Sequence, residues 1–527
     1  MNRIWLLPII SGTVFALAYP PYNLEPLVWL GFLPLFYFLY YSNLKNGFWA
    51  GLIAGFVYFL IVMKWFWAVY PLNWAGFESI IFSGFLVVFV WLISSVGMGL
   101  WWGFFSFVLV KFKTLKKEGY LLLLAPAVFA LSEYIRSWFF GFLWAGPGTF
   151  WGPHWTIGNL AYSLHNNQLF LKLSSFIGIY GITFLIILTN LLIFNLIKSK
   201  VVSAKKIYIT FLLIFTLSFA PKIFGKTNPE QTNQVPVAII QTKTSGDITF
   251  STERQLEEFK RQLSFLKESV KLSPRPKMII FPEGTNFFKS LSIFLDTEEV
   301  RKFFNNNFSE QTLIIDNSRV IDEKGNIKSR VIYLDSQKGV ISFYDKQFLT
   351  PAGEFMPYSL DFLTKLFKQD ATAFTILRKS DKGNKNPEVI NFEDLKTGSL
   401  VCSGLFSPGL FRSLSKQNPD FIIAMTSTGI FKGANDIVQQ DLAIAKFRAS
   451  ESNKYLILTA NNGYSAVIDN TGKIRKIAEN SEPQLFTGQV MPIQKLTWYN
   501  KVGDIPLIIV SFIIVIIGFT ATRSRNF

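Results

Sequence analysis

Three segments of this chain carry side chains that could combine acid–base and nucleophilic chemistry. The central segment, residues 344–357, holds Lys346 and Glu354 on a stretch whose two prolines and glycine prevent a continuous helix or interior strand. A charged pair on such a loop is by itself more typical of a solvated surface. However, an apolar run upstream ends at Glu283, and another downstream ends at Cys402. We expect the ends of separate strands to bring these groups together.

Cys402 is the only cysteine, which excludes an internal disulfide framework and a cysteine-rich metal site. A lone cysteine with apolar neighbours is by default a buried, inert residue. To be a nucleophile it must become a thiolate near a positive group. Histidine, the usual base, occurs only at His154 and His165 in the apolar half of the chain. A working Cys402 would therefore need Glu283 as base and Lys346 as cation, and we predict neither a metal nor a cofactor.

The segments that must position these residues alternate between two periodicities. Short β-branched or apolar runs are interspersed with amphipathic helical patterns, which predicts a layered α/β domain with covered sheets. We expect strands at 235–241, 278–281, 312–316, 331–335, 339–344, 399–402, 421–425, 455–459, 465–469 and 489–492, and helices at 252–272, 408–416 and 436–452. The lysine-rich stretch at 381–387 is expected to be a solvated loop.

Composition indicates a membrane-embedded part joined to a soluble part. Half of the residues are hydrophobic and 17% are aromatic, while the charged residues are unevenly distributed. The net charge of +17 would be compatible with nucleic-acid binding, but the lysines lie mainly beside apolar runs. Charge that flanks membrane spans explains them better, so we expect no nucleic-acid partner.

The N-terminal part is predicted to be a series of membrane spans. Several runs approach the roughly 20 residues that cross a bilayer, and the long fourth run is expected to be tilted or to end in a loop. The first run resembles a signal peptide but lacks a small-residue cleavage site, so we interpret it as a span. The predicted spans are 4–19, 27–41, 48–68, 80–110, 121–140, 173–197, 207–220 and 505–520.

Positive charges set the predicted orientation. Lysine clusters at 111–117 and 198–206 and arginines at 523–525 follow the fourth, sixth and eighth runs. The positive-inside rule then places both termini in the cytoplasm and the α/β domain outside. We divide the chain into a seven-span membrane domain at 1–221, an exported domain at 222–500, and a final span with a cytoplasmic tail at 501–527.

Aromatic and proline-rich connections join the spans on the non-cytoplasmic side. Tryptophan and tyrosine favour the headgroup level, so an interfacial belt is a sufficient explanation. The third connection, 138–153, is too rich in glycine to be a good helix, and it could alternatively line a cavity for acyl chains. Glu133 and Arg136 lie three residues apart, where a helix would place them on one face as a structural ion pair.

Taken in order, these motifs resemble a known family. Phe-Pro-Glu283, Tyr-Asp-Lys346 with the segment through Pro357, and Val-Cys402 resemble the nitrilase superfamily, whose triad is Glu, Lys and Cys. With several spans before the domain and one after it, the chain resembles the apolipoprotein N-acyltransferases. Residues 131–136 and 461–469 also match that family, so the resemblance covers nearly the whole chain.

The resemblance implies a four-layer αββα domain on the outer side of the bacterial cytoplasmic (inner) membrane. Cys402 would take an acyl group from a phospholipid as a thioester and pass it to the α-amine of a diacylglyceryl apolipoprotein. Glu283 would act as general base, and Lys346 would stabilise the thiolate and the oxyanion. By the same resemblance Glu354 is a second acidic group at the substrate site, and Phe250 stands where the family often carries a substrate-facing tryptophan.

The chain departs from the family directly after the nucleophile. The family usually continues as Cys-Tyr-Glu, whereas this chain has Cys402-Ser403-Gly404. Three outcomes are open: an altered substrate, compensation by another acid such as Glu354, or a catalytically dead relative. Two other classes of function also remain, a membrane-tethered nitrilase-type amidase and a non-catalytic lipid or lipoprotein binder. The number of spans disfavours the amidase, and the presence of all three triad residues disfavours the binder.

Overall fold

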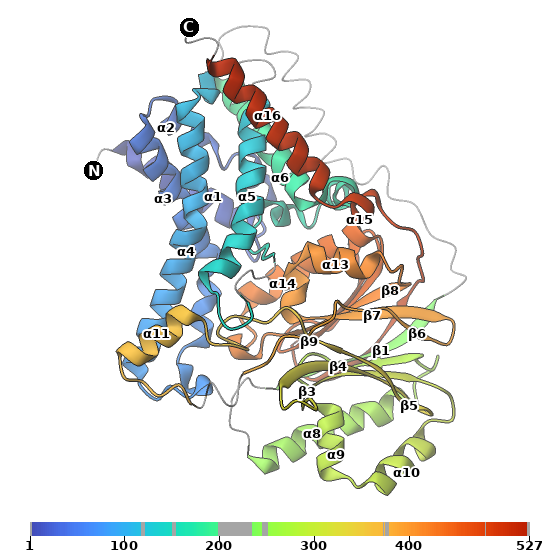
Figure 1. The fold of residues 1–527 in the computed structure, drawn as a ribbon. Coiled ribbons are helices and arrows are strands. Elements are labelled where there is room, and N and C mark those ends of the chain that lie inside the picture. Colours follow the sequence, from blue (N-terminus) through green and yellow to red (C-terminus); the bar gives the residue numbers. More distant parts are fainter. Residues whose placement is uncertain are drawn as a thin grey trace.

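The structure is a computed structural model that describes residues 3–116, 122–149, 154–198, 234–244, 251–372, 374, 379–479 and 481–523. Two predicted features, the seventh span at 207–220 and Phe250, lie outside the described residues. Figure 1 shows a helical domain stacked on an α/β domain, with both ends of the chain at the helical side. The division into an apolar helical part and a sheet-containing part is therefore confirmed in outline.

In the part of the chain that the structure describes, the helical domain contains seven long or medium helices. Among the described residues three of them, α3, α4 and α6, are long and apolar enough to cross a membrane, and shorter apolar helices cover 3–18, 25–40 and 505–520. The fourth predicted span is one unbroken helix rather than a loop-ended one. The helices are α1 (Leu6–Ala18), α2 (Leu33–Tyr40), α3 (Leu44–Val62), α4 (Ile80–Lys111), α5 (Leu124–Leu143), α6 (Gln168–Lys198) and α16 (Ile505–Arg523).

Glycines let α3 and α4 approach each other closely. A side chain at Gly51 would collide with the carbonyl of Trp102, and one at Gly55 would collide with Gly99 on the facing helix. In lipid, helix association depends on such close packing because burial of apolar surface supplies little driving force. These two helices therefore form a tight pair.

The fifth helix corrects one expectation and confirms another. α5 continues as a helix through Gly141 to Leu143, three residues beyond the predicted end of the fifth span at 140 and into the segment 138–153, which we expected to be too rich in glycine for a good helix. The side chain of Leu143 packs against Gly97 of α4, and this tertiary contact outweighs the low helix propensity of glycine. The Glu133–Arg136 pair is structural as expected: it is fully buried, with two charge-assisted contacts of 2.8 Å.

The α/β domain contains two six-stranded sheets packed face to face. Their strand orders are β12-β1-β2-β3-β4-β5 and β11-β10-β9-β8-β7-β6. Parallel pairing joins β1 to β2 and β2 to β3 in the first sheet, and β7 to β8 and β8 to β9 in the second. The strands are β1 (Val235–Gln241), β2 (Met278–Ile280), β3 (Leu313–Ile321), β4 (Ile327–Asp335), β5 (Gly339–Asp345), β6 (Ile390–Phe392), β7 (Leu395–Val401), β8 (Phe421–Ser427), β9 (Tyr455–Asn461), β10 (Ala466–Ile468), β11 (Ile474–Ile477) and β12 (Gln484–Val490).

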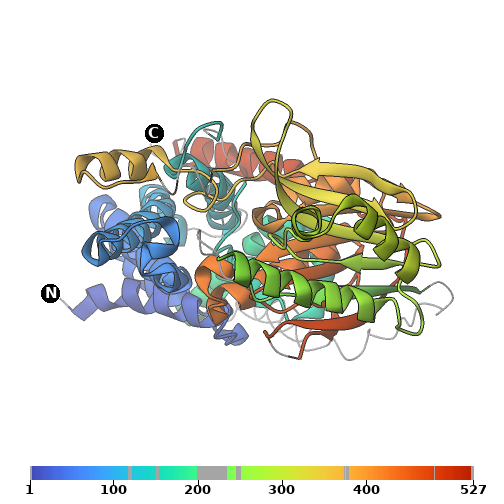
Figure 2. The same cartoon turned by 90° about the horizontal axis from the view of Figure 1, so that it is seen from below.

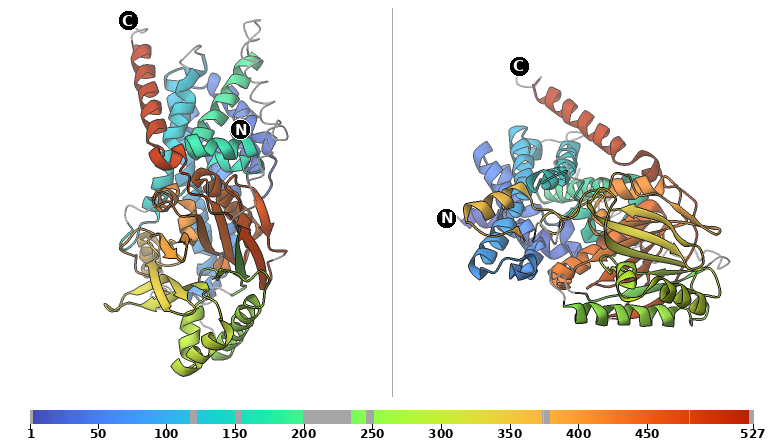
Figure 3. Two further views of the ribbon diagram at one scale, coloured as in Figure 1. Left: turned by 90° about the vertical axis from the view of Figure 1, so that its right-hand side faces the viewer. Right: turned by 60° about the horizontal axis from the view of Figure 1, so that its bottom comes forward.

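Helices cover the outer faces of both sheets, which confirms the predicted four layers. α8 (Thr252–Ser269), α9 (Phe287–Phe294) and α10 (Thr297–Asn307) lie on the first sheet, far from the bundle (Figure 1). Seen from below, they lie in front of the sheets (Figure 2). α13 (Pro408–Ser415) and α14 (Asn435–Ser452) lie between the second sheet and the helical domain, as the turned views of Figure 3 also show. The second sheet is thus the one whose helices contact the bundle.

Several elements differ from the sequence-based expectation. β6, β11, α9, α10, α11 (Tyr358–Leu366) and α15 (Trp498–Val502) were not expected, and β12 begins five residues before the predicted 489–492. β3 continues past the expected end at 316 because Asn317 and Ser318 pair with β4 in an antiparallel hairpin. Backbone pairing with a neighbouring strand, rather than apolar patterning, decides such extensions.

Candidate active site

Lys346 lies directly after β5, on a loop that returns Glu354 to it. The Glu354 carboxylate accepts a hydrogen bond from the Thr350 backbone N–H at 2.8 Å, and this contact closes the turn around Pro351 and Gly353. The Lys346 ammonium contacts Glu283 Oε1 at 2.8 Å and Glu354 Oε2 at 2.7 Å. With only 2% of its side chain exposed, Lys346 is held between two carboxylates and out of bulk solvent.

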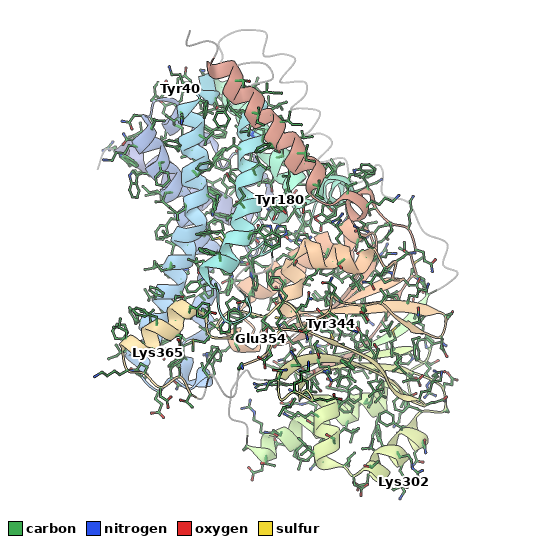
Figure 4. All side chains as sticks on the ribbon, in the orientation of Figure 1. Tyr40, Tyr180, Lys302, Tyr344, Glu354 and Lys365 are labelled. Atoms are coloured by element: carbon green, nitrogen blue, oxygen red, sulfur yellow. The ribbon has the colours of Figure 1, made fainter. Side chains whose placement is uncertain are left out.

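Glu283 follows β2, a short strand buried between β1 and β3. The turn that carries it is held by Asn317 of β3, whose Oδ1 accepts a hydrogen bond from the Gly284 N–H at 2.9 Å. Thr285 Oγ1 donates to the Pro282 carbonyl at 2.7 Å within the same turn. The turn therefore brings the carboxylate to Lys346. Figure 4 labels Glu354, which lies where the helical domain meets the sheets.

Cys402 lies at the point where β7 ends and a short 3-10 turn, Cys402–Phe406, begins. Its φ of 43° is in the left-handed region, which is uncommon for a residue with a side chain and is retained only where surrounding contacts impose it. The next residue, Ser403, donates a hydrogen bond from Oγ to the Phe348 carbonyl on the Lys346 loop. Part of the Cys402 side chain remains exposed, whereas Ser403 is buried.

Burial and charge set the protonation states of these groups. Burial raises the pKa of Cys402 well above its usual range, and the charge of Glu283 raises it further against the opposing effect of Lys346. Burial also raises the pKa of Glu283, with Lys346 opposing and Glu354 adding to the shift. For Lys346, burial alone would lower the pKa, but the charges of Glu283 and Glu354 raise it above its usual range. At rest the site thus holds a neutral thiol beside a permanent cation.

The structure brings Glu283, Lys346 and Glu354 into direct contact and joins the Cys402 turn to the same loop through Ser403. At Gly404, two residues after Cys402, an added Cβ would be in ordinary contact with Leu400 at 3.5 Å. Asp441 of α14, to which no sequence pattern pointed, is buried within reach of the charge of Glu283. Burial first, then the charge of Glu283, raises the pKa of Asp441 to about 8. Nothing local in the sequence of α14 indicated this proximity.

An apolar pocket adjoins the site at the boundary between the two domains. Both the helical domain and the Lys346 loop supply its walls. Phe140 and Trp144 line it, which supports the interpretation of the third aromatic connection as a cavity wall. Trp155 also lines it and packs against Phe348 and Phe406, the residues that flank Lys346 and Cys402 in sequence.

The paired sheets with Glu283, Lys346 and Cys402 at their strand ends define the class of the α/β domain. Residues 237–492 match the family model described as Carbon-nitrogen hydrolase. Residues 11–192 match a second model, described as Apolipoprotein N-acyltransferase N-terminal domain. Together the two models cover most of the helical domain and nearly the whole α/β domain.

Relatives match this chain along nearly its whole length. The apolipoprotein N-acyltransferase of Geobacter metallireducens is 24% identical over 96% of this chain and 92% of its own, and that of Pasteurella multocida is 23% identical over 99% and 96%. The solved structure of Saccharomyces cerevisiae Nit3, a member of branch 10 of the nitrilase superfamily, covers 51% of this chain and 93% of its own at 17% identity with a TM-score of 0.37. On the two family models and the full-length matches, this chain belongs to the apolipoprotein N-acyltransferase family.

Proposed function

We propose that this protein transfers a fatty acyl group from a membrane phospholipid to the N-terminal amine of a diacylglyceryl apolipoprotein, through a thioester on Cys402. The observation that carries the proposal is the position of the Glu283–Lys346–Glu354 cluster and the Cys402 turn beside an apolar pocket shared with the helical domain. A hydrolase of small soluble amides has no need of such a pocket. The family relationship supports the same reaction.

In the first step Glu283 takes the thiol proton of Cys402 as the sulfur attacks the acyl carbonyl of the phospholipid. The raised pKa of Glu283 makes it a stronger base, which suits removal of a proton from a thiol that is neutral at rest. The Lys346 ammonium stabilises the thiolate and the tetrahedral oxyanion. The carbon–oxygen ester bond then breaks, and Glu283 returns the proton to the leaving lysophospholipid.

In the second step the acceptor amine attacks the thioester and the carbon–sulfur bond breaks. An α-amine has a pKa of about 8, so a large part of it arrives as an ammonium and must lose two protons to become an amide. The Cys402 thiolate takes back one proton, and the other must leave the site. We assign the transfer of the first proton to Glu283 and the removal of the second proton to Glu354, since both carboxylates contact Lys346. Glu354 would thereby compensate for the acid missing at Gly404.

The apolar pocket is proposed to hold the acyl chain of the donor. Replacing Val90, which lines the pocket from α4, by phenylalanine should shorten the space and shift the preferred donor toward shorter acyl chains. Val96→Phe on the same helix is the matched control because Val96 is exposed and does not line the pocket. Equal chain-length profiles for the two variants would argue against this use of the pocket.

We place the protein in the bacterial cytoplasmic membrane with about eight spans and with the α/β domain on the outer side. The positive charges after the fourth, sixth and eighth apolar runs support this orientation. The proposed division is a membrane domain at 1–221, a catalytic domain at 222–500 and a last span with its tail at 501–527. In this orientation the active site faces the leaflet that carries the acceptor lipoproteins.

Mass spectrometry of the purified protein tests the proposal directly. After incubation with phospholipid vesicles, a thioester-linked acyl group on Cys402 is expected, and addition of a diacylglyceryl peptide should remove it with formation of an amide. An acyl group released only to water would favour a membrane-tethered amidase. An unmodified thiol after incubation would favour a non-catalytic lipid or lipoprotein binder.

A further inference from the structure

The turn that carries the nucleophile is held from outside the α/β sheets. The carbonyls of Leu405 and Phe406, at the end of the Cys402–Phe406 turn, both accept buried hydrogen bonds from distant side chains. Thr156, from the helical domain, donates to the Phe406 carbonyl from Oγ1 at 2.6 Å and, over a longer 3.4 Å, from its backbone N–H. Arg448 Nε, from α14, donates to the Leu405 carbonyl at 3.3 Å. Two domains therefore hold the same turn.

These two contacts are linked by a hydrogen-bond chain whose direction is forced. Thr156 uses its hydroxyl proton on the Phe406 carbonyl, which can only accept, so the 2.7 Å contact between Thr156 Oγ1 and Tyr162 Oη has tyrosine as the donor. Tyr162 Oη in turn accepts a hydrogen bond from Arg448 Nη2. Each hydroxyl thus donates one bond and accepts one, and a guanidinium stands at the head of the chain.

The hydrogen-bond chain is enclosed by protein along its whole length. Thr156, Tyr162 and Arg448 are 0% exposed, and Arg448 is paired with the carboxylate of Glu451. Burial raises the pKa of Tyr162 to about 12, so its phenol remains a donor at physiological pH. Hydrogen bonds to charged groups are stronger than neutral ones, and successive bonds polarise one another in a low-dielectric interior. Loss of one hydroxyl would leave a buried partner unsatisfied.

The contacts bear on Cys402 because its backbone is in a strained conformation. A left-handed φ at a residue with a side chain persists only when the surroundings over-determine it. Ser403, bonded to Phe348, holds the start of the turn, and Thr156 and Arg448 hold its end. We propose that Thr156 and Tyr162 are positioning residues by which the helical domain sets the geometry of the Cys402 nucleophile. The inference rests on the proposed function and adds residues that touch none of the reacting groups.

Thr156→Val tests the proposal because valine keeps the shape of threonine and removes the hydroxyl. Single-turnover thioester formation with phospholipid vesicles should slow about tenfold or more with little change in the concentration that gives half the maximal rate, since small displacements of a reacting group are costly. Thr156→Ser, which restores the hydroxyl, should recover most of the rate. Tyr162→Phe should act in the same direction as Thr156→Val and decides the question if Thr156→Val does not fold.

Ser450→Ala is the matched control. Ser450 Oγ of α14 donates to the Leu171 carbonyl of α6 at 2.6 Å, a buried hydrogen bond between the same two domains that does not involve the turn. Its removal should lower thermal stability without slowing the thioester step. An equal loss of rate in Ser450→Ala would mean that general domain docking, rather than the turn, is responsible, and would overturn the inference.

A second readout separates this inference from the proposed function. Cys402 is the only cysteine, so alkylation of the whole chain by iodoacetamide reports on this one thiol. In Thr156→Val alkylation at pH 7 should slow, because the displaced thiol lies farther from the carboxylate that takes its proton and from the Lys346 ammonium that stabilises the thiolate. An unchanged or faster rate in a folded variant overturns the positioning role. If the parent forms no thioester, the proposed function fails while the alkylation comparison still decides the role of Thr156.

Discussion

Replacing Glu354 by glutamine should cause the thioester to accumulate, because the second step of the reaction should slow much more than the first. Glutamine keeps an oxygen that can accept the hydrogen bonds from the Thr350 N–H and from Lys346, so the loop should keep its shape. The substitution therefore removes charge and proton-accepting capacity rather than structure. Its effect on each step can be worked out from the positions of the two carboxylates.

In the Glu354→Gln variant, Glu283 should be a weaker base in both steps. The two carboxylate oxygens that hold the Lys346 Nζ are at most about 5.5 Å apart, the sum of the two contact distances. A like charge at that separation is worth about 3 kcal/mol at an effective dielectric constant of about 20, or about two pKa units. Without it the pKa of Glu283 falls. If about half of this difference reaches the transition state for proton transfer, each step slows about tenfold.

The second step carries an additional loss. The acceptor ammonium gives up two protons and the thiolate takes only one, so the glutamine variant lacks the group assigned to the other. Removal of a positioned acid–base group costs on the order of 10²–10⁴ in rate. Thioester formation should thus slow about tenfold and aminolysis by 10² or more. The loss of aminolysis rate should become smaller as the pH rises, because the acceptor amine then becomes neutral.

The two rates are measured separately by quenched mass spectrometry of the acyl-enzyme and by release of the amide product. Glu393→Gln is a suitable control, since Glu393 forms a partly exposed ion pair with Lys277 at 2.6 Å elsewhere in the same domain. Equal slowing of both steps would show that Glu354 acts only through its charge. If neither rate changes, Glu354 is structural and its assignment to aminolysis is refuted.

Three further predictions follow from the same structure. Cys402→Ser should abolish acyl-enzyme formation while the thermal midpoint changes little, because a hydroxyl is far less nucleophilic than a thiolate; full transfer activity in this variant would contradict the mechanism. Because the pKa of Asp441 rises from 3.8 to about 8, its contribution to stability is complete below about pH 4 and is lost as pH rises through about 8. The thermal midpoint of Asp441→Asn should therefore fall less than that of the parent between pH 6 and pH 9, and identical slopes would count against the raised pKa. A reporter active only in the cytoplasm should be silent when inserted at Gly325, in the tip of the β3–β4 hairpin, and active when fused to the C-terminus; the reverse would invert the proposed orientation.

The sequence alone was sufficient to predict the two-part architecture and most of the α/β layers. β1, β2, β5, β8 and β9 begin at their predicted residues because each is a run of apolar or β-branched residues bounded by turns. Glu283, Lys346 and Cys402 could be nominated for the same reason, since each follows such a run. The Glu133–Arg136 pair was predictable because helical periodicity places the two residues on one face.

Features that depend on long-range contacts were decided only by the tertiary structure. α5 continues through Gly141 because α4 packs against it, a contact that no local propensity encodes. Glu354 is bonded to Lys346 and Asp441 is buried beside Glu283 only because the chain folds back on itself. Thr156 reaches the Phe406 carbonyl across 250 positions in sequence, so the hold on the Cys402 turn could not be seen before the two domains were packed together. Residue types determine which chemistry is available to this chain, but packing between its domains determines where each group lies.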